Sequence, residues 1–264
     1  DVDVLSLHGR PLQQIRKHLK NNQNLVLLTD KHSQPQILAE ECINAGFENS
    51  VITVCENLGY AQQEVRRFKV QDLANANIAF DPLHVSIIQS DGSGGVLPEF
   101  PGIPDENFIT GAESGKGLIT KREVRLAILS LMQPGNNDVI WDVGAGCGSV
   151  AVELAYWNKT CQVFAIEKHP ERLTCLNANS ERFGVVSQLT VVEGRAPLAL
   201  GGLPKANKVF VGGSDGELPT LLNQVWQELP VGGVLVCSAV TENTRQSLIS
   251  FLQTRQECQD TDCE

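Results

Sequence analysis

The chain has 264 residues, of which 42% are hydrophobic and 20% charged, a composition typical of a folded protein with room for two domains of ordinary size. With 21 Lys and Arg against 31 Asp and Glu, the formal net charge is −10, which argues against nucleic acid or an anionic membrane surface as a partner. No apolar run approaches the roughly 20 residues that cross a bilayer, so we expect no membrane span.

The first 90 residues alternate strand-like and helix-like segments, which predicts an α/β domain. We expect strands over 2–7, 24–30, 51–56 and 84–89, and helices over 11–21 and 34–46. The chain opens directly in strand-like sequence, without an initiator Met or a basic leader. From this we expect that the natural N-terminus lies upstream.

Residues 91–117 contain seven Gly and three Pro and show no hydrophobic periodicity, which predicts a linker. The pattern restarts at residue 118. "TKRE" predicts a capping box at the start of a helix over 120–133, with Thr120 as N-cap and Glu123 three residues later.

Beyond that helix, strands and helices alternate strictly, which predicts a parallel sheet covered on both faces. The expected strands are 138–143, 161–167, 189–193, 208–212 and 233–240, and the expected helices are 149–158, 170–183, 217–229 and 242–255.

Cysteine and histidine usage indicates neither disulfides nor a metal. The eight Cys include no C-x-x-C pair and most lie inside apolar runs, so we expect reduced thiols in a cytoplasmic protein. The five His are scattered, and none pairs with Cys or carboxylate at metal-ligand spacing, so we expect no metal site.

The stretch "VIWDVGAGCGSVAVELA", residues 139–155, runs from an apolar strand through Gly144, Gly146 and Gly148 into an apolar helix. In a parallel sheet, ligands bind beyond the carboxyl ends of the strands, so this turn is the expected site. No Gly-Lys-Ser/Thr follows, which excludes a P-loop, and Ser149 stands where a dinucleotide-binding turn would have its third glycine. The G-x-G-x-G turn resembles motif I of Rossmann-like S-adenosylmethionine-dependent methyltransferases. An NAD-dependent oxidoreductase remains the alternative.

Two further strand ends support a nucleoside-bearing ligand. Glu167 ends the next strand, 19 residues after Gly148, close to the spacing at which a carboxylate accepts hydrogen bonds from a ribose diol. "VVEGRAPLAL" ends the third strand, where the methyltransferase class usually recognises adenine, with Ala196 as the expected donor. Because no Asn-Pro-Pro-Tyr follows the fourth strand, the acceptor is expected to be carbon or oxygen rather than an amino group.

Longer stretches resemble one family. "GLITKREVRLAILSLMQPGNNDVIWDVGAGCGSVAVELA", "VGGSDGELPTLL" and "VGGVLVCSAVTENT" are similar to the decarboxylating carbon-15 methylase of cobalamin biosynthesis. "SLHGRP" and "ENLGYAQQEVRRFKVQDLA" resemble the second half of the tetrapyrrole methylase domain that acts at carbon 5. In this order they resemble the precorrin-6Y C(5,15)-methyltransferases (decarboxylating). The resemblance implies a partial tetrapyrrole methylase domain over 1–90 and a Rossmann-like methyltransferase domain over 118–264.

The resemblance also implies the chemistry. S-adenosyl-L-methionine would donate a methyl group to carbon 15 of a poly-carboxylate precorrin or cobalt-precorrin, and the acetate of ring C would lose its carboxyl group, while carbon-5 activity would be incomplete here. The residues expected to bind the cofactor are Thr120, Gly144, Ala145, Gly146, Cys147, Gly148, Glu167 and Ala196. Lys121, Arg122 and Arg125 are expected to bind substrate carboxylates. No catalytic base is assigned.

The family further implies a homo-oligomer such as a tetramer. Its fold continues for two more strands after the last helix, so we expect a C-terminally truncated domain with an exposed fifth strand. A non-catalytic, cofactor-binding fragment is therefore a second alternative.

Overall fold

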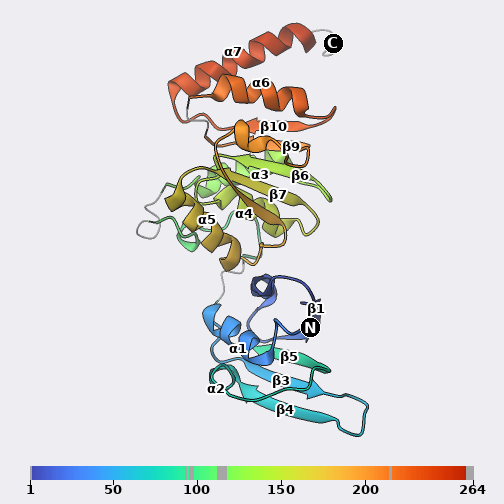
Figure 1. Ribbon diagram of the computed structural model, residues 1–264. Helices are drawn as coiled ribbons and strands as arrows, with labels where there is room; N and C mark the ends of the chain where they lie inside the picture. The colour runs from blue at the N-terminus through green and yellow to red at the C-terminus, as the bar shows by residue number, and fades with distance from the viewer. Residues whose placement is uncertain (1, 93, 95–97, 112–117, 214–215, 260–264) are drawn as a thin grey trace. The chain divides into compact units, whose positions relative to one another are not determined.

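The computed structural model describes residues 2–92, 94, 98–111, 118–213 and 216–259, with side chains to residue 255. The chain divides into two compact units (Figure 1). The first comprises Asp1–Glu99 and Ser180–Ser187, and the second comprises Phe100–Asn179 and Gln188–Glu264.

The first unit is built on a five-stranded sheet of order β1-β2-β5-β3-β4, in which β1 and β2 are parallel and all other neighbours are antiparallel. Its elements are β1 (Val2–Ser6), η1 (Leu12–His18), β2 (Gln23–Leu28), α1 (Pro35–Asn44), β3 (Val51–Glu56), β4 (Glu64–Lys69), α2 (Val70–Leu73) and β5 (His84–Ser90). Each expected strand and helix of this region is present, although 11–21 forms a shorter 3₁₀ helix.

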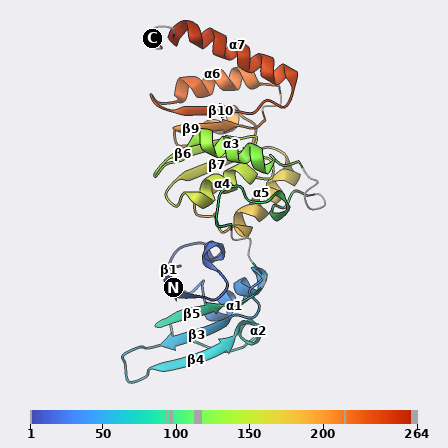
Figure 2. The same ribbon diagram turned by 180° about the vertical axis from the view of Figure 1, so that it is seen from behind.

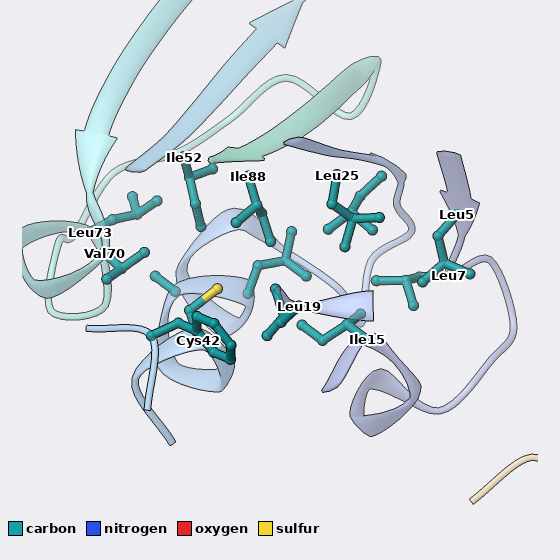
Figure 3. Packing of buried hydrophobic residues seen from close by; sticks show 14 of the residues in the cluster. Leu5, Leu7, Ile15, Leu19, Leu25, Cys42, Ile52, Val70, Leu73 and Ile88 are labelled. Atoms are coloured by element: carbon teal, nitrogen blue, oxygen red, sulfur yellow. The ribbon is translucent and has the colours of Figure 1, made fainter. Parts of the chain in front are cut away.

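The core of this unit lies between one face of the sheet and the helices. Leu25, Ile52 and Ile88 point from three neighbouring strands towards Ile15 of η1 and Cys42 of α1 (Figure 3). All five side chains are fully buried, as expected when alternate strand residues face a helical layer.

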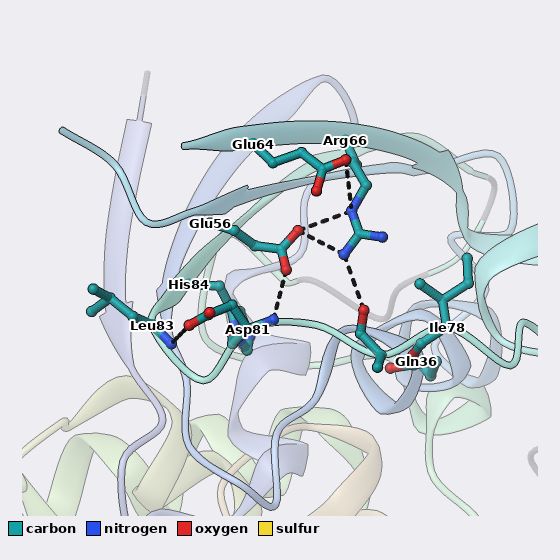
Figure 4. Close-up of polar contacts among 9 residues, drawn as sticks. Gln36, Glu56, Glu64, Arg66, Ile78, Asp81, Leu83 and His84 are labelled. Carbon is teal, nitrogen blue, oxygen red and sulfur yellow. Dashed lines mark hydrogen bonds and ion pairs between the residues drawn. The ribbon is translucent and has the colours of Figure 1, made fainter. Parts of the chain in front are cut away.

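Strand β4 was not expected from the sequence, because "EVRRFK" is largely charged and lies at the sheet edge. A buried carboxylate explains how it is held (Figure 4). Oε2 of Glu56 accepts hydrogen bonds from Nε and Nη2 of Arg66 at 2.9 and 2.6 Å, and its Oε1 accepts one from the backbone N–H of Asp81 at 2.6 Å. Charge pairing across β3 and β4 thus replaces apolar patterning.

The second unit contains an all-parallel sheet of order β10-β9-β6-β7-β8. Its elements are η2 (Asp105–Asn107), α3 (Arg122–Met132), β6 (Val139–Val143), α4 (Ser149–Trp157), β7 (Gln162–Glu167), α5 (Pro170–Arg182, of which residues 180–182 are counted with the first unit), β8 (Leu189–Glu193), η3 (Leu198–Leu200), β9 (Lys208–Val211), α6 (Leu218–Glu228), β10 (Val234–Cys237) and α7 (Glu242–Gln259). The predicted Rossmann-like α/β architecture is confirmed.

Helices cover both faces of this sheet. On one face, α3 packs against β9 and β10, α4 packs against β7 and β8, and the two helices contact each other (Figure 2). On the other face, Trp141 and Val143 of β6 and Val209 of β9 pack with Leu221 and Val225 of α6. The central strand is therefore buried on both sides, and its carboxyl end is the open end.

Two sequence expectations need correction here. Within the expected linker, residues 100–111 belong to the second unit and bury Ile103 and Phe108, whereas 93, 95–97 and 112–117 lie outside the described residues. The expected capping box does not form, because the N-cap of α3 is Lys121 rather than Thr120 and no side chain caps it. The helix start is held instead by a buried arginine, described below.

Candidate functional site

A cavity opens at the carboxyl end of the parallel sheet in the second unit. The chain runs from β6 to β7 and β8 on one side, while β9 and β10 lie on the other, so the strand order reverses beside β6. Such a reversal leaves a crevice for ligands in α/β sheets. Its lining comes from four strand ends, at 143–144, 166–169, 194–196 and 212–213, with Arg172 of α5.

The three glycines of the glycine turn (residues 144–148) serve different purposes. A Cβ on Gly144 would lie 2.6 Å from the carbonyl oxygen of Gly213, and one on Gly148 would lie 2.1 Å from Cδ1 of Leu176. At Gly146, where φ is +60°, a Cβ would meet nothing within 4 Å. Two glycines therefore allow close packing, whereas Gly146 exposes bare backbone to open space where a ligand can approach.

Glu167 organises this turn. Its side chain is 3% exposed; Oε2 accepts a hydrogen bond from the N–H of Gly146 at 2.9 Å. Oε1 accepts two more, from Lys168 N–H at 2.8 Å and His169 N–H at 2.9 Å. A carboxylate has about four acceptor positions, so Oε2 retains capacity for a hydroxyl group of a ligand.

Asp142, on β6 just before the turn, is a buried acid without a hydrogen-bond partner of good geometry. It is 1% exposed, and neither carboxyl oxygen is bonded to any described residue. Burial raises the pKa of Asp142 from 3.8 to about 7, and the charge of Glu167 adds to the rise, while the nearby N–H of Ala151 opposes it. Asp142 lies behind the cavity wall rather than among the residues that line it.

Three basic residues at the cavity wall were not predicted from the sequence. Lys168, His169 and Arg172 follow the end of β7 and line the cavity, and Nη1 of Arg172 lies 3.9 Å from Oε2 of Glu167. Their proximity to the second strand end in "IEKHPER" was the available signal. Lys168 and Arg172 place positive charge at the cavity wall near Glu167.

Among the expected cofactor residues, Gly144, Glu167 and Ala196 line the cavity. Ala145, Gly146, Cys147 and Gly148 belong to the adjoining glycine turn, whose Gly146 is bonded to Glu167. Thr120 is half-buried and is not part of the lining; its carbonyl accepts a hydrogen bond from Nη1 of Arg125.

Arg125 contradicts the expectation of a substrate contact. Its side chain is fully buried, with Nε donating to Oε1 of Glu153 at 2.9 Å and Nη1 donating to Oδ1 of Asp105 at 2.6 Å. Nη2 donates to the carbonyl of Ile103, and the guanidinium lies 4.8 Å from the ring centroid of Phe108. Because every nitrogen of the guanidinium is already bonded, Arg125 is a structural residue.

The other two expected substrate residues lie at the surface. Lys121 is exposed, with Nζ 3.6 Å from Oδ2 of Asp105, and Arg122 is exposed as well. Lys121 and Arg122 therefore remain candidates for binding substrate carboxylates.

Within the described residues, no group of three His, Cys, Asp or Glu is arranged to hold a metal ion. None of the helices in that part of the chain has the length and apolar character of a membrane span.

Comparisons with known proteins show which family the chain belongs to. A family model described as "Precorrin methyltransferase domain" matches residues 112–257. The chain is 37% identical, over 94% of its length, to a precorrin-6Y C(5,15)-methyltransferase (decarboxylating) from Sinorhizobium, of which it spans 59%.

Two further similarities concern the second unit. A probable cobalt-precorrin-6B C(15)-methyltransferase (decarboxylating) from Methanothermobacter thermautotrophicus is 39% identical over 57% of this chain and 77% of that protein. The crystal structure of a precorrin-6y C5,15-methyltransferase from Geobacter metallireducens aligns with a TM-score of 0.55 and 37% identity, over 59% of this chain and 80% of that one. The resemblance predicted from the motifs is confirmed: the chain belongs to the precorrin methyltransferase family.

Proposed function

We propose that the second unit binds S-adenosylmethionine at the carboxyl edge of its sheet and uses it to methylate carbon 15 of a precorrin-type tetrapyrrole, with decarboxylation of the ring C acetate. The observation that carries the proposal is the pairing of Gly146 with Glu167. Gly146 leaves its backbone open to a ligand. Glu167 accepts a hydrogen bond from the N–H of Gly146, and its carboxylate can accept another from a ligand.

The residues present fit this cofactor. Glu167 would accept hydrogen bonds from ribose hydroxyls, the glycine turn would lie against the methionine end, and Ala196 would lie at the adenine edge. By contrast, the third glycine that seats a pyrophosphate is replaced by Ser149, which is 2% exposed, and this disfavours a nicotinamide dinucleotide.

When bound, S-adenosylmethionine supplies a methyl group already activated as a sulfonium. The chain's own task is then to hold donor and acceptor in line and to exclude water, effects that together contribute up to about 7–11 kcal/mol in favourable cases. No side chain at the site is required as a general base for this transfer. Exposed Lys121 and Arg122 remain candidates for the substrate carboxylates, and the basic wall at 168–172 adds a second source of positive charge.

The proposal covers methylation at carbon 15 and not at carbon 5. The Sinorhizobium relative is named for methylation at carbons 5 and 15, and the chain spans 59% of its length. We further propose a cytoplasmic location, supported by the free thiols of Cys42, Cys55, Cys147, Cys161, Cys175 and Cys237. We also propose a homo-oligomer, which rests on the family resemblance and is tested by light scattering during size-exclusion chromatography.

The test is mass spectrometry of a precorrin-6Y-type substrate incubated with the chain and S-adenosylmethionine. A product that has gained one methyl group and lost carbon dioxide supports the proposal. Calorimetry with S-adenosylhomocysteine and with NAD runs alongside, on wild type, Glu167→Ala and Glu171→Ala, the last being an exposed acid four residues away. Glu167→Ala should lose binding and Glu171→Ala should keep it. Cofactor binding without turnover would favour the binding-fragment alternative, and tighter binding of NAD would refute the proposal.

A further inference from the structure

A partly buried segment precedes α3 in the second unit and is held by one acidic side chain, Glu153, and one amide side chain, Asn179. This strap, residues 102–111, begins at the carboxylate of Glu153, whose oxygens accept hydrogen bonds from Gly102 N–H at 2.8 Å and Ile103 N–H at 3.1 Å. Glu153 is 0% exposed and lies on α4, the helix that starts directly after the glycine turn. The strap is therefore fixed to the element that continues the turn.

Asn179 of α5 joins the same strap to the glycine turn itself. Its Nδ2 donates to the carbonyl of Ile109 at 2.9 Å and to the carbonyl of Cys147 at 2.8 Å. Its Oδ1 accepts from Ile109 N–H at 2.8 Å. The side chain is 0% exposed, so both amide protons and the oxygen are committed to these backbone groups away from water.

Close packing reinforces this arrangement along one side of α5. Leu176, three residues before Asn179, lies so near the turn that a Cβ on Gly148 would be 2.1 Å from its Cδ1. Cys175, four residues before Asn179, lies 3.5 Å from where a Cβ of Gly111 would be. Residues three and four apart share a helix face, so one face of α5 contacts the turn and the strap together.

We infer that Asn179 is a positioning residue that couples the strap to the glycine turn and thereby sets the turn conformation that receives the cofactor. Asn179 does not line the cavity and acts through Cys147. The inference rests on the proposed function for the identity of the cofactor only; the coupling between strap and turn is a property of the ligand-free chain.

Two variants break the coupling at different points. Asn179→Ala removes all three hydrogen bonds. Asn177→Ala is its control, because Asn177 is exposed on the same helix and its Nδ2 donates to the carbonyl of Leu173 within that helix. Ile109→Pro removes the N–H group that donates to Oδ1 of Asn179 and changes no residue of the glycine turn. The preceding residue, Phe108, already has φ −92° and ψ 141°, which proline permits. Ile109→Ala keeps the N–H and is the matched control.

Two readouts are compared on each variant. The first is hydrogen exchange, by mass spectrometry, of the amides at 144–148 in the ligand-free protein. The second is the Kd for S-adenosylhomocysteine by calorimetry, corrected for the folded fraction from urea denaturation. Asn179→Ala and Ile109→Pro should both accelerate exchange in the turn and weaken binding about tenfold, the equivalent of one hydrogen bond. Both controls should match wild type.

Unchanged exchange in Asn179→Ala and Ile109→Pro would overturn the inference. So would an effect of Asn179→Ala with none of Ile109→Pro, because it would confine Asn179 to its contact with Cys147. Wild-type protein that binds no S-adenosylhomocysteine while exchange in the turn still responds to both variants would refute the proposed function and support the coupling.

Discussion

The buried carboxyl group of Asp142 should make the free energy of unfolding fall as pH rises, whereas most carboxylates make it increase. Its pKa is raised from 3.8 to about 7 by burial, with the charge of Glu167 adding to the rise. The folded chain therefore binds one proton more than the unfolded chain between these two pH values. The free energy of unfolding should fall as pH rises from about 4 to about 7 and then level off, as far as this group is concerned.

The magnitude follows from the same two values. Each pH unit between them corresponds to about 1.36 kcal/mol, so ionising Asp142 in the folded state costs about 4 kcal/mol at pH 8. Asp142→Asn keeps the shape of the side chain and cannot ionise. The variant should be more stable than wild type by only about 1 kcal/mol near pH 4.5 and by up to about 4 kcal/mol at pH 8.

Urea denaturation at pH 4.5, 6 and 8, followed by tryptophan fluorescence, measures this difference. Asp138→Asn is a control of opposite sign. Burial opposes ionisation of Asp138, but hydrogen bonds from Gly135 and Asn207 and the charge of Lys208 outweigh it and lower its pKa. Its ionised form stabilises the fold above its ordinary pKa, so Asp138→Asn should destabilise at pH 8. If Asp142→Asn is no more stable than wild type at pH 8, Asp142 has partners that the structure does not show and the reasoning fails.

Three other outcomes are expected. Gly144→Ala should destabilise the second unit by about 3 kcal/mol, because φ is positive there and the new Cβ would meet the backbone of Gly213. Gly146→Ala should cost only about 1–2 kcal/mol of stability but weaken S-adenosylhomocysteine binding at least tenfold. Urea denaturation measures the first effect and calorimetry the second. Arg125→Met should destabilise by about 3–5 kcal/mol, because Glu153 is left buried without its partner, and a cost below about 1 kcal/mol in denaturant would contradict the structural role. S-adenosylhomocysteine at 100 times its Kd should raise the free energy of unfolding of wild type by about 2.7 kcal/mol, and no shift in the urea midpoint would exclude specific binding to the folded state.

The sequence predicted those features that local patterns encode. Alternating apolar strands and amphipathic helices gave the parallel sheet, and the order of strand ends placed Gly144, Glu167 and Ala196 around one cavity. Such features depend on periods of 2 and 3.6 residues and on a topological rule, and all of these are visible in a single chain.

Long-range polar pairing was not predictable in the same way. Arg125 was expected to bind substrate because it clusters with Lys121 and Arg122 beside the expected cofactor site, yet its partner Glu153 is 28 residues away. Asn179 carried no signal at all, because its value depends on backbone groups of Ile109 and Cys147 that only the folded chain brings near it. Spacing along the chain does not report which polar side chains will share a buried pocket.

The central position of β6 has a consequence for how the molecule is made. Ile140 of β6 pairs with Val163 of β7 and also with Lys208 of β9, so the two sides of the cavity close over sequence separations that differ about threefold. Contacts between distant segments form late, because the entropy of closing the larger loop must be overcome first. During synthesis, residues 139–167 emerge well before β9. Until β9 pairs with β6, one edge of β6 is unpaired and one side of the cavity is missing. The ability to bind a ligand should therefore appear only at the last stage of folding, in step with the docking of β9, and a fluorescent cofactor analogue would report that stage alone.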